Sequence, residues 1–261
     1  MQQLKVKEAK SLSIVIMIGD PDLETTFKLL EIAMDAGVDV FEIGIPMSAP
    51  YLDSQVMRDS MNRALAFSAQ HDFYLEALHK IRERFPQVIV EVMIYHETVM
   101  EIGLDKFCAA LEEARMDCVL VADAVFKGNA FLGLLDQKLL PGNIYPIRFV
   151  PHPYDTGQFA DLKRNGRGFI IVQTKTDPQG LRPGILDENR QSLQEIRSAG
   201  IELPLIFAYG IQTPADVRKC ISLGADGVLI GTVLLDTAHR LPRADYVKLL
   251  RDLRKAAAPL A

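Results

Sequence analysis

The sequence is poor in cysteine and has no excess of positive charge. Its three cysteines, Cys108, Cys118 and Cys220, are odd in number and form no Cys-x-x-Cys pair, which argues against a disulfide framework or a zinc knuckle. The formal net charge of −5 gives no reason to expect nucleic acid or an anionic membrane as a partner. Any phosphate group must therefore be bound by local geometry and not by a basic surface.

Long apolar runs are missing as well. No stretch approaches the roughly 18 apolar residues of a membrane span. The first 22 residues, MQQLKVKEAKSLSIVIMIGDPD, have a charged start and one short apolar run, without the length or cleavage site of a signal peptide. Together with the few cysteines, these absences predict a protein of the reducing cytoplasm.

Short apolar runs rich in Val and Ile are what the chain has instead, with amphipathic segments between them. The eight runs cover residues 13–19, 39–45, 88–95, 117–123, 144–150, 168–174, 203–210 and 226–232. Buried strands that alternate with helices indicate a parallel sheet covered on both faces. Eight such units predict the α/β class, with residues 1–261 forming a single (β/α)8 TIM-barrel domain. A doubly wound open sheet is the alternative, disfavoured because no Gly-x-Gly-x-x-Gly follows a strand.

The segments between the runs support this fold. Apolar residues at 104, 107, 108 and 111 have helical spacing, and residues 55–86 are long enough to predict two helices in one connection. In barrels of this kind the chemistry lies at the carboxyl ends of the strands. Candidate functional residues are therefore those in the second half of each apolar run or just after it.

Two carboxylates meet that condition in the stretch FEIGIPMSAPYLDS, residues 41–54. Glu42 lies within the strand, and alternation predicts that it faces the barrel axis if Phe41 and Ile43 face the helices. Poor solvation there would raise the pKa of its carboxyl toward neutrality, as general acid–base chemistry requires. Asp53 follows a loop with two prolines and is expected to reach the same mouth while staying ionised. The structural alternatives are a buried ion pair for Glu42 and a helix cap for Asp53.

Two glycines near the end of the chain indicate an anion site. Gly210 and Gly231 follow the last two predicted strands and precede helical segments, in FAYGIQTPADV and GADGVLIGTVLL. Glycine permits close backbone approach, and amides at a helix N-terminus bind anions without a cationic side chain. This placement is typical of the phosphate site of such barrels, although both glycines could also serve only as turn residues.

Four stretches taken together, GDPD, FEIGIPMSAPYLDS, VLVAD and ADGVLIGTVLL, resemble the tryptophan synthase alpha subunit family. The similarity runs in order along nearly the whole chain. It implies a carbon–carbon lyase of tryptophan biosynthesis that cleaves indole-3-glycerol phosphate, or a related aryl glycerol phosphate, to indole and glyceraldehyde 3-phosphate by a retro-aldol step. The resemblance implies no cofactor and no metal.

The resemblance also implies roles for single residues. It places the catalytic acid–base glutamate at Glu42, which would protonate indole C3 and take a proton from the glycerol hydroxyl. It places the aspartate that stabilises the indole nitrogen's proton at Asp53. The substrate-binding positions fall at Tyr95, Gly180 (or Gly184), Tyr209, Gly210, Gly231 and Thr232.

The chain departs from the family pattern at three places. Ala49 replaces the loop aspartate and Ser54 replaces the glycine after the catalytic aspartate, in the loop through which the family contacts its beta subunit. A beta subunit is therefore a possible but doubtful partner. Ile171 stands where the family has a tyrosine, and TKTDPQGLRPG replaces its sixth loop. These changes indicate a divergent member, with slow turnover or another aromatic ring as substrate.

Three other functions fit parts of the sequence. Lys175 ends the sixth strand, where a Schiff-base aldolase keeps its lysine. His96, Asp123 and His152 all end strands and could together hold a metal ion. A barrel that has lost activity could serve as a non-catalytic regulatory or binding paralogue, although the retained Glu42 argues against it.

Overall fold

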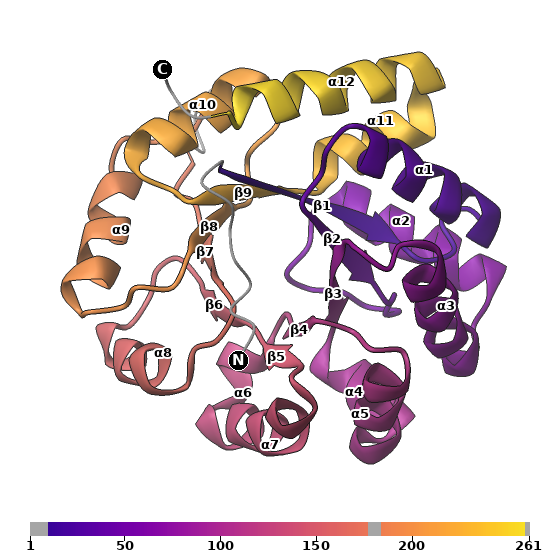
Figure 1. The fold of residues 1–261 in the computed structure, drawn as a ribbon, viewed down its shortest axis with the longest axis horizontal. Coiled ribbons are helices and arrows are strands. Elements are labelled where there is room, and N and C mark those ends of the chain that lie inside the picture. The colour runs from indigo at the N-terminus through magenta and orange to yellow at the C-terminus, as the bar shows by residue number, and fades with distance from the viewer. Residues whose placement is uncertain (1–9, 177–183, 259–261) are drawn as a thin grey trace.

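Nine short strands form one parallel sheet in the computed structural model, which describes residues 10–176 and 184–258. The strands are β1 (Ser11–Met17), β2 (Val40–Gly44), β3 (Ile89–Ile94), β4 (Cys118–Val121), β5 (Tyr145–Pro146), β6 (Arg148–Val150), β7 (Ile170–Gln173), β8 (Leu205–Ala208) and β9 (Gly227–Ile230). Their order in the sheet is β5-β4-β3-β2-β1-β9-β8-β7-β6. Figure 1 shows them as a ring with the helices outside it.

The two ends of that order are neighbours in the chain, which is how the sheet closes. β5 pairs with β4, β6 pairs with β7, and only Ile147 separates them. Along this segment, successive backbone N–H groups point alternately toward β4 and toward β7. Pro146 has no N–H to donate toward β7, so pairing with β7 begins at Arg148. The predicted eight-stranded barrel is thus confirmed, with its fifth strand divided in two.

Helices fill the connections between the strands and form the outer layer in Figure 1. They are α1 (Leu23–Asp35), α2 (Gln55–Phe67), α3 (His71–Arg84), α4 (His96–Ile102), α5 (Leu104–Glu113), α6 (Ala124–Lys127), α7 (Asn129–Leu139), α8 (Phe159–Asn165), α9 (Asn189–Ser198), α10 (Pro214–Leu223), α11 (Thr232–Arg240) and α12 (Arg243–Ala256), with 3-10 turns η1 (Leu140–Gly142) and η2 (Thr156–Gln158). The two helices predicted within residues 55–86 are α2 and α3.

Strand alternation divides the apolar residues into two cores. Phe41 and Ile43 of β2 belong to the outer core, between the strands and the helices. Val15, Met93 and Ile171 belong to the inner core, inside the barrel. Because neighbouring side chains of a strand point to opposite faces, Glu42 lies on the inside. The predicted orientation of Glu42 is confirmed.

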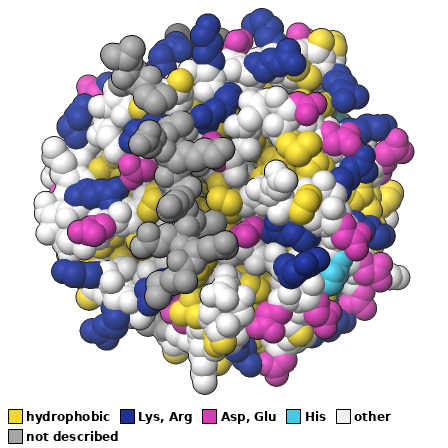
Figure 2. All heavy atoms as spheres, in the orientation of Figure 1, with side chains coloured by type: hydrophobic (Ala, Val, Ile, Leu, Met, Phe, Trp, Pro, Cys, Tyr) yellow, Lys and Arg dark blue, Asp and Glu magenta, His cyan; other side chains and the backbone are white. Residues whose placement is uncertain are grey.

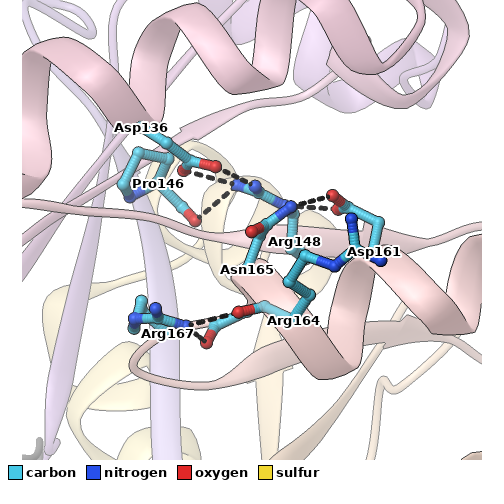
Figure 3. A network of polar contacts seen from close by, with 8 residues as sticks. Asp136, Pro146, Arg148, Asp161, Arg164, Asn165 and Arg167 are labelled. Carbon is cyan, nitrogen blue, oxygen red and sulfur yellow. Dashed lines mark hydrogen bonds and ion pairs between the residues drawn. The ribbon is translucent and has the colours of Figure 1, made fainter.

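A buried arginine joins the divided strand to two helices. Arg148 is 3% exposed, and its guanidinium contacts Asp136 of α7 at 2.5 Å and Asp161 of α8 at 3.0 Å. It also donates to the carbonyl oxygen of Pro146 at 3.1 Å. Figure 3 shows Arg148 between the two carboxylates. The cluster satisfies a buried charge from both sides and so fixes α7 and α8 against the closing strand.

The outer surface carries charges of both signs. Figure 2 shows Lys and Arg side chains interspersed with Asp and Glu on one face, in agreement with a formal net charge of only −5. Within the part of the chain that the structure describes, no helix has the length and hydrophobicity needed to cross a membrane.

Candidate active site

A cavity of about 250 Å³ opens among the carboxyl ends of the strands. Six of the predicted site residues line it: Glu42, Asp53, Tyr209, Gly210, Gly231 and Thr232. Apolar side chains form much of the remaining wall, among them Met93, Leu120, Phe149 and Ile171. The cavity therefore combines a mostly apolar chamber, suited to an aromatic ring, with a few polar groups that can orient a ligand.

Glu42 is the most deeply placed polar group of the cavity. Its side chain is 3% exposed, and its Oε2 atom is buried with no hydrogen-bond partner. No cation pairs with it in the described residues, so the buried ion pair considered from the sequence is absent there. Burial raises the pKa of Glu42 from 4.5 to about 8. The carboxyl is thus mostly protonated at neutral pH and can donate a proton.

Asp53 is held at the cavity by Tyr95. The Tyr95 hydroxyl donates to Oδ2 of Asp53 at 2.6 Å. Burial raises the pKa of Asp53, while the Tyr95 hydrogen bond and the charge of Arg58 act in the opposite direction. The helix cap considered for Asp53 belongs to its neighbour, because Ser54 Oγ accepts from the backbone N–H of Met57 at the start of α2. Asp53 is therefore free of a capping role.

Tyr95 itself is 1% exposed and is not among the residues that line the cavity. Its ring packs edge-on against Tyr51, with the centroids 5.7 Å apart. The Tyr51 hydroxyl in turn donates to Asp123 Oδ2 at 2.8 Å. These contacts attach the loop after β2 to the loop after β4, and they place Tyr95 behind Asp53.

The predicted anion site lies where β8 and β9 end. Gly231 is the N-cap residue of α11, whose first residue is Thr232. The first N–H groups of a helix have no partner within the helix, so those of α11 are available to an anion in the cavity. Gly210 has a φ of +69°, a backbone conformation that glycine adopts without strain, and lines the same cavity. Thr232 Oγ1 and Ser54 Oγ lie 3.1 Å apart at its edge.

Other candidates from the sequence do not come together at this cavity. Lys175 does not line it, and its backbone N–H donates to Asn189 Oδ1. In residues 10–176 and 184–258, no group of three or more His, Cys, Asp or Glu side chains is placed to hold a metal ion, so the set of His96, Asp123 and His152 considered as an alternative does not form. Gly180 lies outside the described residues, whereas Gly184 lies within them but away from the cavity.

The sequence patterns discussed above did not single out a further buried carboxyl, that of Glu91. Glu91 of β3 is fully buried beside Glu42, its register partner on β2. The signal was present in the sequence, since VIVEVMIY places a glutamate in the middle of an apolar strand in the same way that VFEIGI does.

The fold and the cavity define the class: a (β/α)8 barrel with buried carboxyls in an apolar chamber and a helix N-terminus at its edge. The model of the tryptophan synthase alpha chain family matches residues 1–258, and the chain belongs to this family. The resemblance seen in the four sequence stretches is thereby confirmed.

Individual relatives align with this chain over nearly their full length. The tryptophan synthase alpha chain of Pelobacter propionicus is 32% identical over 261 residues, covering 97% of this chain and 94% of that protein. That of Citrifermentans bemidjiense is 31% identical over 249 residues, covering 95% and 90%. The crystal structure of the tryptophan synthase alpha chain from Legionella pneumophila superposes with a TM-score of 0.82 at 27% identity, covering 98% of this chain and 94% of that one.

Proposed function

We propose that Glu42 and Asp53 cleave the bond between an indole ring and a glycerol phosphate chain in the cavity described above. The chain is a carbon–carbon lyase of the alpha-subunit type, which converts indole-3-glycerol phosphate to indole and glyceraldehyde 3-phosphate. The observation that carries the proposed residue roles is the position of Glu42, a buried carboxyl with a pKa of about 8 that faces an apolar chamber.

The first step needs an acid. Protonation of indole C3 turns the ring into an electron sink, and a neutral Glu42 carboxyl can supply that proton at pH 7. Glu42 is then a carboxylate, and it takes the proton of the glycerol hydroxyl as the carbon–carbon bond breaks. The bonding electrons return to the ring, the hydroxyl carbon becomes an aldehyde, and Glu42 regains its proton.

Asp53 supports the same step from the ring's other side. When C3 is protonated, the indole nitrogen acquires positive charge, and a carboxylate near its N–H stabilises that charge. Tyr95 keeps Asp53 in place through the 2.6 Å hydrogen bond, so we assign Tyr95 to positioning Asp53. The phosphate group lies at the first turn of α11 and beside Gly210, where backbone amides bind it without a lysine or arginine.

A product assay tests the proposal. Purified protein is given indole-3-glycerol phosphate, and glyceraldehyde 3-phosphate release is followed with a coupled dehydrogenase. Glu42→Gln keeps the shape but removes proton transfer, so kcat should fall about 10²- to 10⁴-fold while substrate still binds. Glu97→Gln, an exposed glutamate outside the cavity, is the matched control and should retain activity. Full activity of Glu42→Gln would contradict the mechanism.

Substrate choice is tested in the same assay. Ile171 contributes an aliphatic wall where the family has a tyrosine. We expect slower release from indole-3-glycerol phosphate than in relatives that keep the tyrosine, and Ile171→Tyr should raise the rate. If the protein cleaves another aryl glycerol phosphate in preference to the indole compound, the proposed mechanism stands and the proposed substrate is wrong.

A further inference from the structure

Glu42 has a second buried carboxyl directly beside it. The parallel register of β2 and β3 pairs Glu42 with Glu91, and Glu91 is two residues from Met93, which faces the inside of the barrel. Side chains of register partners in neighbouring strands lie on the same face. Glu91 is 0% exposed and does not line the cavity, so it lies beside Glu42 and away from the place proposed for the substrate.

Among the described residues, no positive charge is paired with Glu42 or Glu91. Neither carboxyl oxygen of Glu91 has a partner from a donor group in the described residues, and the same holds for Oε2 of Glu42. On the other side of Glu91, β4 presents the Cys118 thiol, whose pKa is raised by burial, so that it is neutral. Beyond it, Arg82 is already paired with Asp117. The remaining titratable groups that act on Glu42 are Asp53 and Tyr209.

Two adjacent carboxylates in such a place cannot both be ionised, because each charge is poorly solvated and repels the other. Burial raises the pKa of both, and that of Glu91 lies well above its ordinary value. The interaction between the two carboxyls lowers the pKa of Glu42 and raises that of Glu91. Glu42 lines the cavity and Glu91 does not, so Glu42 is the better solvated of the two and ionises first. Glu91 is then a neutral acid whose O–H can point at the Glu42 carboxylate.

We propose that Glu91 is a positioning residue that stays protonated throughout the reaction and donates a hydrogen bond to Glu42 when Glu42 is ionised. This inference rests on the proposed function of Glu42. After Glu42 has given its proton to ring carbon 3, no cation in the described part of the chain is paired with its negative charge, and the Glu91 O–H supplies the stabilisation. Glu42 then takes the hydroxyl proton as the carbon–carbon bond breaks, so the pair begins and ends the cycle with two protons.

Two substitutions separate the hydrogen bond from the packing. Glu91→Met keeps the volume but removes the donor, so the ionised state of Glu42 loses its stabilisation. We expect kcat at pH 7 to fall about 10- to 100-fold, the range of a hydrogen bond to a charged group. The fall of kcat/KM at alkaline pH, where Glu42 has lost its proton in the free protein, should move about one pH unit higher. Glu91→Gln retains an N–H donor, so both its kcat at pH 7 and the alkaline limb of its kcat/KM profile should stay close to those of wild type.

Cys118→Ala is the matched control, since Cys118 is the register partner of Glu91 on β4 and is equally buried. It changes a side chain of the same layer but leaves both carboxyls in place, so the pH profile should stay where it is in wild type. A Glu91→Met variant with the wild-type rate and profile would overturn the proposal. So would a shift of equal size in Cys118→Ala, because general disturbance of the layer would then explain the effect.

An infrared measurement determines the protonation state of Glu91 without any substrate. Protonated carboxyls and carboxylates absorb at different frequencies, and ¹³C-labelled glutamate identifies them as glutamates. The difference spectrum between wild type and Glu91→Gln at pH 7 should show the loss of a protonated carboxyl. Loss of a carboxylate instead would overturn the proposal. A neutral Glu91 in a protein that cleaves no aryl glycerol phosphate would contradict the proposed function and leave the hydrogen-bonded pair standing.

Discussion

Tyr95 contacts Asp53 and not the cavity. The family resemblance makes it a substrate-binding residue, yet its side chain is 1% exposed and its hydroxyl is used in the bond to Asp53. A tyrosine in direct contact with substrate would contribute to KM. A tyrosine that holds Asp53, the aspartate proposed to be catalytic, would instead contribute to kcat, because it would set the position and charge of Asp53 in the transition state.

Replacement of Tyr95 by Phe distinguishes these two roles. The variant lacks only the hydroxyl, so Asp53 loses a donor that favours its ionised form and its pKa rises further. We expect kcat to fall about 10- to 100-fold with KM nearly unchanged, measured by glyceraldehyde 3-phosphate release.

Tyr74→Phe provides the comparison for Tyr95→Phe. Tyr74 is also buried, but its hydroxyl donates to the backbone oxygens of Ala64 and Ser68, away from the cavity. Loss of the Tyr74 hydroxyl should lower the free energy of unfolding and leave kcat as in wild type. A rise in KM at constant kcat for Tyr95→Phe would show that Tyr95 contacts substrate after all.

At the scale of elements, the closing strand is the least regular part of the barrel. It is divided at Ile147, and each half has pairing on one side only. Fewer ladder hydrogen bonds fall on this segment than on a continuous strand. The Arg148 cluster compensates from outside by joining the strand to α7 and α8 through two carboxylates (Figure 3).

Arg148→Met should therefore destabilise the whole fold. It removes the cation and leaves the carboxylates of Asp136 and Asp161, 13% and 17% exposed, without their partner. Breaking a buried pair from one side costs about 3 to 5 kcal/mol. Urea unfolding followed by circular dichroism gives the change in the free energy of unfolding.

The same substitution at an exposed pair is the control. Arg84 pairs with Glu31 on the surface, where the side chains are 51% and 39% exposed. Arg84→Met should cost no more than about 1 kcal/mol. Equal losses in the two variants would mean that the buried cluster does not stabilise the closing strand.

At the scale of the whole molecule, the buried carboxyls make stability depend on pH. The pKa of Glu42 is raised from 4.5 to about 8, so between these values the folded state holds a proton that the unfolded chain releases. The free energy of unfolding then decreases as pH rises, by up to about 1.4 kcal/mol per pH unit for each such group. Glu91 contributes in the same direction, since its pKa is also raised.

Denaturant unfolding at pH 6 and pH 9 measures this dependence. We expect wild type to be less stable at pH 9, and Glu42→Gln and Glu91→Gln each to reduce the difference, because an amide does not titrate. A wild-type stability that is constant or rises between these pH values would show that the two carboxyls ionise as freely when folded as when unfolded.

Partner binding also belongs to this scale. Ala49 is exposed in the loop after β2, where the family pattern has an aspartate. We expect a tryptophan synthase beta subunit to bind weakly, because loss of one interface charge commonly costs a few kcal/mol when its partner stays unpaired. Calorimetry with a relative's beta subunit tests this, and Ala49→Asp should tighten binding. Tight copurification of the wild-type chain with a beta subunit would refute the expectation.

The sequence by itself determined the barrel and the inward position of Glu42. Both follow from local regularities: eight Val- and Ile-rich runs separated by helices, and alternation along a strand. The glycines after β8 and β9 could be recognised as candidates for the same reason, since a strand, a glycine and a helix follow one another directly in the chain.

Only the tertiary structure decided which distant groups meet. Tyr95 and Asp53 are 42 residues apart, and nothing in the sequence shows that their side chains are hydrogen-bonded. The role proposed for Glu91 depends on the register of β2 and β3, which sets it beside Glu42, and neither carboxyl oxygen of Glu91 has a hydrogen-bond partner in the described residues. The physical reason is that a pKa depends on burial and on neighbours in space, and those are properties of the packed barrel and not of any one segment.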